Sequence, residues 1–189
     1  VEAVTLVLMF LGNLSFVTAW YLWTGRFAAV ARNGEVRLFT LALPLAAALV
    51  FFFSTGILYQ NLDKAARVAI FETMSALTTT GFSTVGYGDW NSSGIAMLIV
   101  LMLIGGGTAS TAGGLKQFRV HLAALFIYWE LKRLLLPRSA VMACPVWEGS
   151  HRVFLSDARV RQVCVFILLY LAMFAAGTFL LCAHGYSLS

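Results

Sequence analysis

The chain has 189 residues, of which 60% are hydrophobic and only 11% are charged. Soluble domains usually carry about 25% charged residues, so the composition excludes an ordinary soluble enzyme or binding domain and indicates an integral, multi-pass membrane protein. The formal net charge is +5, but the basic residues lie between apolar segments, where membrane topology places them. We therefore expect no nucleic-acid partner.

The first apolar segment runs from Val4 to Trp23 and is long enough to cross a bilayer as one span. It lacks the basic start and the small-residue cleavage site of a signal peptide. Because the chain starts at Val1 rather than Met, we expect it to be a piece of a longer protein. A polar linker follows, and a second apolar segment, residues 38–59, predicts a second span.

Residues 65–77 predict a helix that is too short and too charged to cross the membrane, with Asp63 as its N-cap. A helix that enters the membrane and stops before a polar stretch is typical of a re-entrant pore loop, because irregular backbone at membrane depth must be buried in protein or line a watery path. Glu72 lies within this helix. It either attracts cations or pins the following loop by accepting backbone N–H bonds.

The polar stretch TTTGFSTVGYGD contains two sequences that look like K⁺ filters, which are rings of backbone carbonyls that replace the water shell of the ion. We favour the first, residues 78–83, because a filter must directly follow its pore helix and Thr78 to Gly81 is a poor helical stretch. The second, Thr84 to Asp89, stays open as the filter of a tetrameric K⁺ channel; otherwise it is an outer return segment, with Asp89 capping the next helix. The carbonyls expected to face the ion path, with K⁺ at Thr80 and Gly81, belong to Thr79, Thr80, Gly81 and Phe82.

Residues 93–136 form a third apolar segment, which is interrupted by GGGTASTAGG at residues 105–114. Each glycine costs a helix about 1 kcal/mol relative to alanine, so we expect unwound backbone that acts as a gate, with small side chains lying across a narrow path and glycine hinges that let them move. A phosphate-binding loop does not fit, because Leu115 separates Lys116 from the glycines and no strand precedes them. Helix packing through GxxxG is the remaining alternative. The expected gate residues are Gly105, Gly106, Gly107, Thr108, Ser110, Thr111, Gly113 and Gly114.

Lys and Arg are distributed unequally between the loops. Eleven lie in the linker after the first span or between residues 116 and 161, whereas the stretch from Asn61 to Ser92 holds only two. The positive-inside rule places the eleven in the cytoplasm, so the pore loop opens outward. Residues 137–162 are then a cytoplasmic connector, and residues 163–189 contain a last span.

No metal or catalytic cluster is recognisable in the sequence. Cys144, Cys164 and Cys182 lack the spacing of metal ligands, and no nucleophile–base pair or paired carboxylates appear. We expect no enzyme activity and no cofactor, with K⁺ as the transported ion. A non-conducting membrane scaffold would explain the spans but not two polar interruptions at membrane depth.

The order of these motifs resembles the Trk/Ktr/HKT superfamily of K⁺ transporters, most closely its bacterial TrkH-type members. TTTGFST resembles the filter of the family's third pore repeat, LIGGGTASTAGGLK its intramembrane loop, and ELKRLLLPRSAV its cytoplasmic link to the fourth repeat. The resemblance implies four span–loop–span repeats around one pore. Residues 1–37 would be the last helix of the second repeat and its linker, residues 38–136 the third repeat, and residues 163–189 the first helix of the fourth.

The resemblance also implies K⁺ uptake across the cell (inner) membrane. On this basis Gly81 is the selectivity-filter glycine, and residues 105–114 are the gate below the filter. The implied partners are a second copy of the same subunit, in a homodimer, and cytoplasmic nucleotide-binding regulatory subunits that contact the basic inner face.

Overall fold

The computed structural model describes residues 1–135, 145–148, 151–154 and 157–185. They divide into two compact units, the first holding Val1–His121 and Trp147–Arg152 and the second Leu122–Val146 and Val153–Ser189. The described residues are almost entirely helical, which confirms the predicted all-helical class. Cys144 and much of the predicted connector lie outside the described residues.

The first predicted span is broken. Helices α1 (Glu2–Asn13) and α2 (Phe16–Trp23) meet at an angle of 106°, so the prediction of one uninterrupted helix is wrong. Leu14 is extended, with φ −66° and ψ 135°, and Ser15 is the N-cap of α2, a position that serine favours. The short helix α3 (Phe27–Arg32) then leads into the second span.

The second span is continuous over 25 residues, Gly34–Leu58. It comprises α4 (Gly34–Val50), the π-helical turn η1 (Phe51–Thr55) and α5 (Gly56–Leu58). Its N-cap is Asn33, whose Oδ1 accepts from the backbone N–H of Glu35 at 3.1 Å. It therefore begins four residues before the predicted residue 38.

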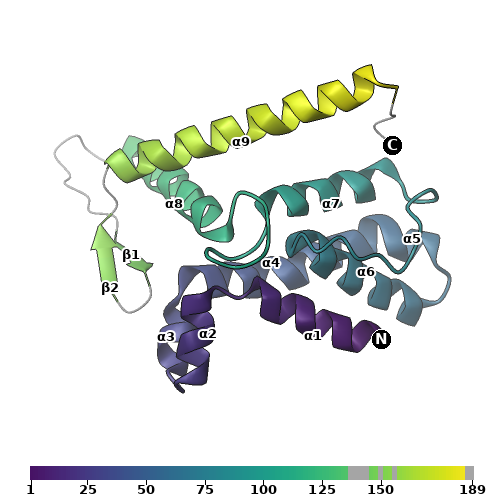
Figure 1. Ribbon diagram of the computed structural model, residues 1–189, viewed down its shortest axis with the longest axis horizontal. Coiled ribbons are helices and arrows are strands. Elements are labelled where there is room, and N and C mark those ends of the chain that lie inside the picture. Colours follow the sequence, from purple (N-terminus) through teal and green to yellow (C-terminus); the bar gives the residue numbers. More distant parts are fainter. Residues whose placement is uncertain (136–144, 149–150, 155–156, 186–189) are drawn as a thin grey trace. The chain divides into compact units, whose positions relative to one another are not determined.

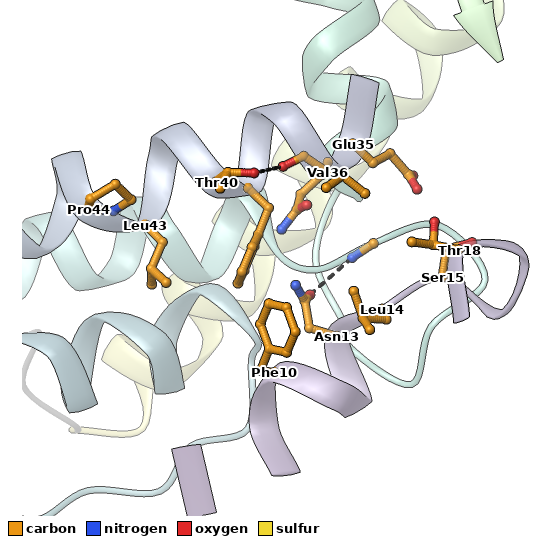
Figure 2. A pocket seen from close by; sticks show the side chains of 13 residues that line it. Phe10, Asn13, Leu14, Ser15, Thr18, Glu35, Val36, Thr40, Leu43 and Pro44 are labelled. Carbon is orange, nitrogen blue, oxygen red and sulfur yellow. Dashed lines mark hydrogen bonds between the residues drawn. The ribbon is translucent and has the colours of Figure 1, made fainter. Parts of the chain in front are cut away.

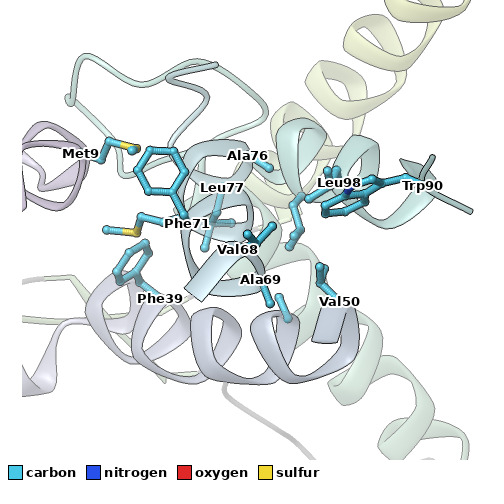
Figure 3. Close-up of a cluster of buried hydrophobic side chains, with 13 residues drawn as sticks. Met9, Phe39, Val50, Val68, Ala69, Phe71, Ala76, Leu77, Trp90 and Leu98 are labelled. Carbon is cyan, nitrogen blue, oxygen red and sulfur yellow. The ribbon is translucent and has the colours of Figure 1, made fainter. Parts of the chain in front are cut away.

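Helix α6 (Leu62–Leu77) lies at the centre of the first unit and contacts α1, α4 and α7 (Figure 1). Figure 3 shows its Val68, Phe71 and Leu77 in the core cluster, beside Phe39 of α4 and Leu98 of α7. This burial fixes the end of α6 against three neighbours. The predicted cap at Asp63 is wrong, because Oδ1 of Asn61 accepts from the N–H of Asp63 at 3.0 Å and Asn61 is the N-cap.

Helix α7 (Ser92–Ile104) has 13 residues, so it is about 20 Å long and too short to cross a bilayer alone. Its N-cap is Asn91 rather than the predicted Asp89, since Oδ1 of Asn91 accepts from the N–H of Gly94 at 3.0 Å. A non-helical loop separates it from α8 (Gln117–Leu134). The predicted glycine-rich interruption of this span is confirmed.

The remaining described elements are a hairpin and a long helix. Strands β1 (Pro145–Glu148) and β2 (His151–Phe154) pair in the region predicted as a connector. Helix α9 (Asp157–Ala183) contains an apolar window within Ala158–Ala183. Within the part of the chain that the structure describes, two helices are long and apolar enough to cross a membrane, or three if the bent pair of α1 and α2 counts as one span.

Candidate ion-permeation site

Helix α6 ends in a tight turn that starts the polar segment Thr78–Ser83. The Thr78 hydroxyl donates to the carbonyl of Met74 at 2.8 Å, and the N–H of Thr80 donates to the carbonyl of Ser75 at 3.0 Å. These bonds satisfy carbonyls in the last turn and leave the chain pointing away from the helix. The aligned peptide dipoles give this helix end the equivalent of about −0.5 of an elementary charge, which favours a nearby cation.

Two residues of this segment have a positive φ, Thr79 at 54° and Gly81 at 77°. Positive φ is uncommon for a residue other than glycine and signals a local constraint at Thr79. At Gly81, an added Cβ would meet no atom within 4 Å. Glycine is therefore needed here for its backbone conformation and not for space.

The carbonyl groups of Thr78–Ser83 accept no backbone hydrogen bond from the described residues. Residues 80–83 are also exposed, and the Phe82 side chain is 56% exposed. Backbone carbonyls inside a membrane protein are normally paired. Unpaired carbonyls that directly follow a helix C-terminus are the oxygen ligands that a partly dehydrated cation requires.

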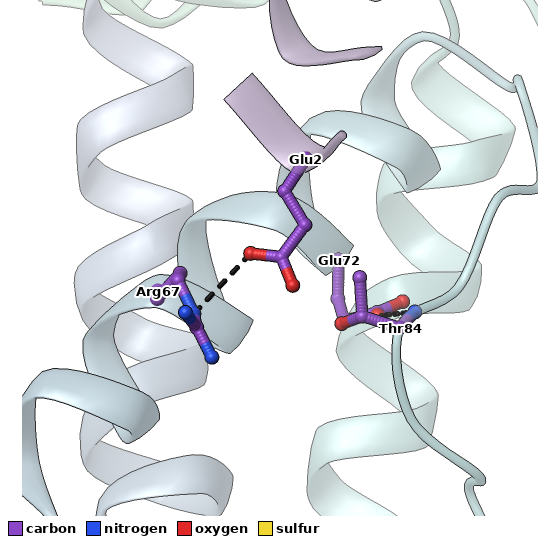
Figure 4. Close-up of polar contacts among 4 residues, drawn as sticks. All are labelled: Glu2, Arg67, Glu72 and Thr84. Atoms are coloured by element: carbon purple, nitrogen blue, oxygen red, sulfur yellow. Dashed lines mark hydrogen bonds and ion pairs between the residues drawn. The ribbon is translucent and has the colours of Figure 1, made fainter. Parts of the chain in front are cut away.

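Glu72 holds the return segment that follows. It is 1% exposed, and its Oε1 accepts from the N–H of Thr84 at 2.8 Å and from the Thr84 hydroxyl at 3.1 Å. Oε2 accepts from the Tyr87 hydroxyl at 2.5 Å. Figure 4 shows Glu72 facing Thr84, whereas Arg67 on the same helix forms an exposed ion pair with Glu2 at 3.2 Å.

Tyr87 hydrogen-bonds to the second carboxylate oxygen of Glu72. Burial raises the pKa of the Tyr87 hydroxyl to about 12, and the hydrogen bond to Glu72 adds to the rise. The phenol therefore stays protonated at neutral pH and donates to the carboxylate. The Tyr87 ring packs edge to face on Trp90, with 5.4 Å between ring centroids. The return segment is thus tied to α6 by hydrogen bonds and to α7 by Trp90, which is buried against Leu98.

The loop between α7 and α8 folds back on itself. The N–H of Gly106 donates to the carbonyl of Gly113 at 3.2 Å, and the N–H of Leu115 donates to that of Leu103 at 2.9 Å. The Gln117 amide donates to the carbonyl of Gly105 at 3.2 Å. The predicted gate residues therefore lie together in one compact, non-helical loop.

Glycines let the two arms of this loop touch. A Cβ on Gly105 would lie 2.2 Å from the carbonyl oxygen of Gly113, and one on Gly114 would lie 2.5 Å from the Cα of Gly105. Both residues also have positive φ, 70° and 84°. No other residue type fits these positions without moving backbone.

The loop of residues 105–114 reaches the segment after α6. The N–H of Gly113 donates to the hydroxyl Oγ1 of Thr79 at 2.6 Å. A side chain that follows the loop also holds it, because the Lys116 ammonium donates to the carbonyl of Ser110 at 3.3 Å and to the carbonyl of Ala112. The structure thus joins two predicted sites, residues 78–83 and 105–114, through one direct hydrogen bond.

Two residues of this site were not predicted from the sequence. Asn13 and Glu35 accept backbone N–H bonds from Gly107 at 3.1 Å and from Thr108 at 2.9 Å. A usable signal was present, because Asn13 is an amide inside an otherwise apolar segment, and polar groups at membrane depth need a partner. Among the described residues, no group of three or more His, Cys, Asp or Glu side chains could hold a metal ion.

The helices and the glycine-rich break define a helical membrane protein, and the carbonyls of Thr78–Ser83, which accept no backbone hydrogen bond from the described residues, are candidate ligands for a cation. The cation transport protein family TrkH matches residues 1–186, and the chain belongs to this family. The predicted resemblance to the Trk/Ktr/HKT superfamily is confirmed.

Individual relatives are named as transporters. An uncharacterised cation transporter of Methanocaldococcus jannaschii is 32% identical over 119 residues, which are 63% of this chain and 24% of that protein. The Trk system potassium uptake protein TrkH of Vibrio parahaemolyticus is 44% identical over 81 residues, 43% of this chain and 17% of its own length. The crystal structure of the potassium transporter TrkH from Vibrio parahaemolyticus matches with a TM-score of 0.82 and 28% identity, over 98% of this chain and 40% of that one. The chain therefore spans less than half the length of these relatives.

Proposed function

We propose that the chain is part of a K⁺-uptake protein and that Thr78–Ser83 is one of its selectivity filters. The observation that carries this proposal is the row of unpaired carbonyls at the C-terminus of α6. K⁺ enters such a site when carbonyl oxygens replace its water shell, and the helix end adds negative potential. The choice of K⁺ rests on the relatives that are named as potassium uptake proteins.

The placement of the filter at residues 78–83 is supported by a difference in hydrogen bonding between the carbonyls of the two candidate segments. In the alternative filter, Thr84–Asp89, the carbonyl of Val85 accepts from the Ser83 hydroxyl at 2.6 Å and that of Tyr87 accepts from the N–H of Trp90 at 3.0 Å. Thr84 itself is held by Glu72. These bonds fit an outer return segment and favour residues 78–83 over the filter of a tetrameric channel.

Glu72 is proposed to pin the return segment. Both of its carboxylate oxygens already accept hydrogen bonds and the side chain is buried, so it is poorly placed to attract ions from solution. A carboxylate that accepts several N–H and O–H bonds is a strong anchor. We assign to Glu72 the task of holding the far end of the filter relative to α6.

Residues 105–114 are proposed to form the gate. Gly113 of this loop lies against Thr79 in the filter segment. A loop with few side-chain atoms can cross an ion path, and it can leave that path without repacking a hydrophobic core. The loop therefore controls passage after an ion has left the filter.

The larger assembly is proposed from the resemblance to the family. The structural match covers 98% of this chain but only 40% of the solved transporter. We therefore propose that the chain supplies the third of four repeats, with residues 1–37 and 163–189 belonging to the neighbouring repeats. We further propose a homodimer in the cell membrane that binds cytoplasmic nucleotide-binding regulatory subunits.

The experiment that tests this function is K⁺ uptake by K⁺-transport-deficient cells that express the full-length protein. Gly81→Ser is compared with Gly86→Ser, since an added Cβ meets no atom within 4 Å at either position and only Gly81 has a positive φ. We expect wild type and Gly86→Ser to restore growth at low K⁺, while Gly81→Ser loses uptake or admits Na⁺. If Gly86→Ser abolishes uptake and Gly81→Ser is silent, the filter is Thr84–Asp89.

A further inference from the structure

The gate loop is held by two side chains that come from outside its own span. The N–H of Gly107 donates to Oδ1 of Asn13 at 3.1 Å, and the N–H of Thr108 donates to Oε1 of Glu35 at 2.9 Å. Asn13 is 3% exposed and Glu35 is 7% exposed. Buried polar groups of this kind are costly unless paired, so each of these bonds ties the loop to a fixed helix end.

Asn13 acts from the bend between α1 and α2. A Cβ on Gly106 would lie 2.4 Å from Oδ1 of Asn13, and one on Gly107 would lie 2.7 Å from its backbone oxygen. The loop backbone therefore approaches the bend as closely as glycine allows. Two further bonds join the same segments, from the N–H of Phe16 to the carbonyl of Ala109 at 3.3 Å and from the Thr111 hydroxyl to the carbonyl of Gly12 at 3.1 Å.

Glu35 acts from the first turn of α4, the helix that begins the next span. A carboxylate in the first turn is stabilised by the positive end of the helix dipole. From this position its Oε1 accepts the N–H of Thr108. The two bonds reach adjacent residues of the loop from two different helices.

A cavity of about 370 Å³ adjoins these contacts. It is lined by Asn13, Glu35 and Gly107, and otherwise mainly by apolar residues that include Phe39 and Leu43. Figure 2 shows Asn13 at this cavity, with its bond to the loop. Once both bonds break, the loop has space on this side into which its tip can move without displacing a packed helix.

We propose that Asn13 and Glu35 are positioning residues that latch the gate loop in its closed position. The proposal rests on the gate role assigned to residues 105–114 above. The latch spans the junction between two repeats, because Asn13 belongs to the preceding helix pair and Glu35 to the start of the next span. Movement of either helix end can therefore release this side of the loop, which the bond from Gly113 to Thr79 otherwise joins to the filter segment.

The test uses the full-length protein in proteoliposomes, with Rb⁺ flux and the Rb⁺-to-Na⁺ ratio as readouts. Asn13→Ala and Glu35→Ala remove the acceptors and are each expected to raise Rb⁺ flux about threefold to tenfold, with the ion ratio unchanged. Asn13→Asp and Glu35→Gln keep an oxygen at the same place and should stay within about twofold of wild type. A structural role alone would lower flux or alter selectivity.

Thr40→Val is the matched control. Thr40 lines the same cavity on α4, but its hydroxyl donates to the carbonyl of Val36 within its own helix and not to the loop. It should leave flux unchanged. If a folded Asn13→Ala or Glu35→Ala protein carries wild-type or lower flux, the latch is overturned.

Hydrogen exchange separates the latch from the proposed function. In wild type, the amides of Gly107 and Thr108 should exchange slowly, and each alanine variant should speed exchange in the peptide that contains them. Unchanged exchange in both alanine variants overturns the latch, whatever the flux. If wild type carries no Rb⁺ flux, the proposed function fails, while the exchange result still decides whether these side chains hold the loop.

Discussion

The filter segment, residues 78–83, and the gate loop, residues 105–114, both depend on glycine, but for different reasons. A Cβ on Gly81 would meet no atom within 4 Å, whereas a Cβ on Gly105 or Gly106 would lie 2.2 Å from another atom of the loop. The filter segment needs glycine for a backbone conformation that leaves carbonyls free. The gate loop needs it so that two backbone segments can touch. Filter substitutions should therefore change transport in a folded protein, and gate-loop substitutions should first change folding.

The largest expected effect on stability is at Gly105. Its φ of 70° and ψ of −165° lie in a region that is nearly restricted to glycine, and a Cβ there would meet the backbone of Gly113 and Gly114. We expect Gly105→Ala to lower the free energy of unfolding by at least about 3 kcal/mol. Thermal unfolding of the purified full-length protein in detergent measures this loss.

The control for Gly105 is Gly88→Ala in the return segment. An added Cβ at Gly88 would meet no atom within 4 Å, and Gly88 is not among the residues with positive φ. The thermal unfolding midpoint of Gly88→Ala should stay close to that of wild type. A Gly105→Ala protein that unfolds at the wild-type temperature would show that the two arms of the loop are not in contact.

A smaller loss is expected at Glu72. Glu72→Ala removes the acceptor for Thr84 and Tyr87, two residues that are themselves exposed, so the lost hydrogen bonds should cost about 1 to 2 kcal/mol. K⁺ uptake should fall as well, because the far end of the filter is released. Arg67→Ala, on the same helix, breaks only an exposed ion pair and should cost below about 1 kcal/mol. Equal losses in the two variants would contradict the pinning role of Glu72.

Tyr87→Phe should have the smallest effect, about 1 kcal/mol at neutral pH, because it removes one hydrogen bond to Glu72 and keeps the ring on Trp90. The pKa of Tyr87 is raised from 10.0 to about 12 in the folded protein. Its contribution to stability is therefore complete below pH 10 and is lost as the pH rises toward 12. Unfolding midpoints of wild type and Tyr87→Phe should converge over this range; a constant difference would exclude the bond.

Composition and apolar runs were sufficient to predict the helical membrane class, whereas the family was predicted from the resemblance of TTTGFST, LIGGGTASTAGGLK and ELKRLLLPRSAV to its motifs. The interruption at residues 105–114 was also predictable, because consecutive glycines cannot continue a helix at low cost. The assignments of Thr79 to Phe82 as ion ligands and of residues 105–114 as a gate remain proposals.

The misses have a common physical origin in side chains that pair with distant backbone. Nothing local in the apolar run from Val4 to Trp23 requires a 106° bend, but the Asn13 amide accepts from Gly107, 94 residues away. Glu35 lies in the predicted polar linker and was not singled out, because its partner Thr108 is 73 residues away. The two caps were misplaced by two residues, since Asn61 and Asn91 take the position that aspartate also favours.

The most direct measurement is a crystal structure of the full-length protein soaked with Rb⁺, with the ion located by its anomalous scattering. We predict a peak bounded by the carbonyls of Thr79, Thr80 and Gly81, above the hydrogen bond between Thr79 and Gly113. A peak at the carbonyls of Val85 to Gly88, with none beside Gly81, would contradict the assignment of residues 78–83 as the filter.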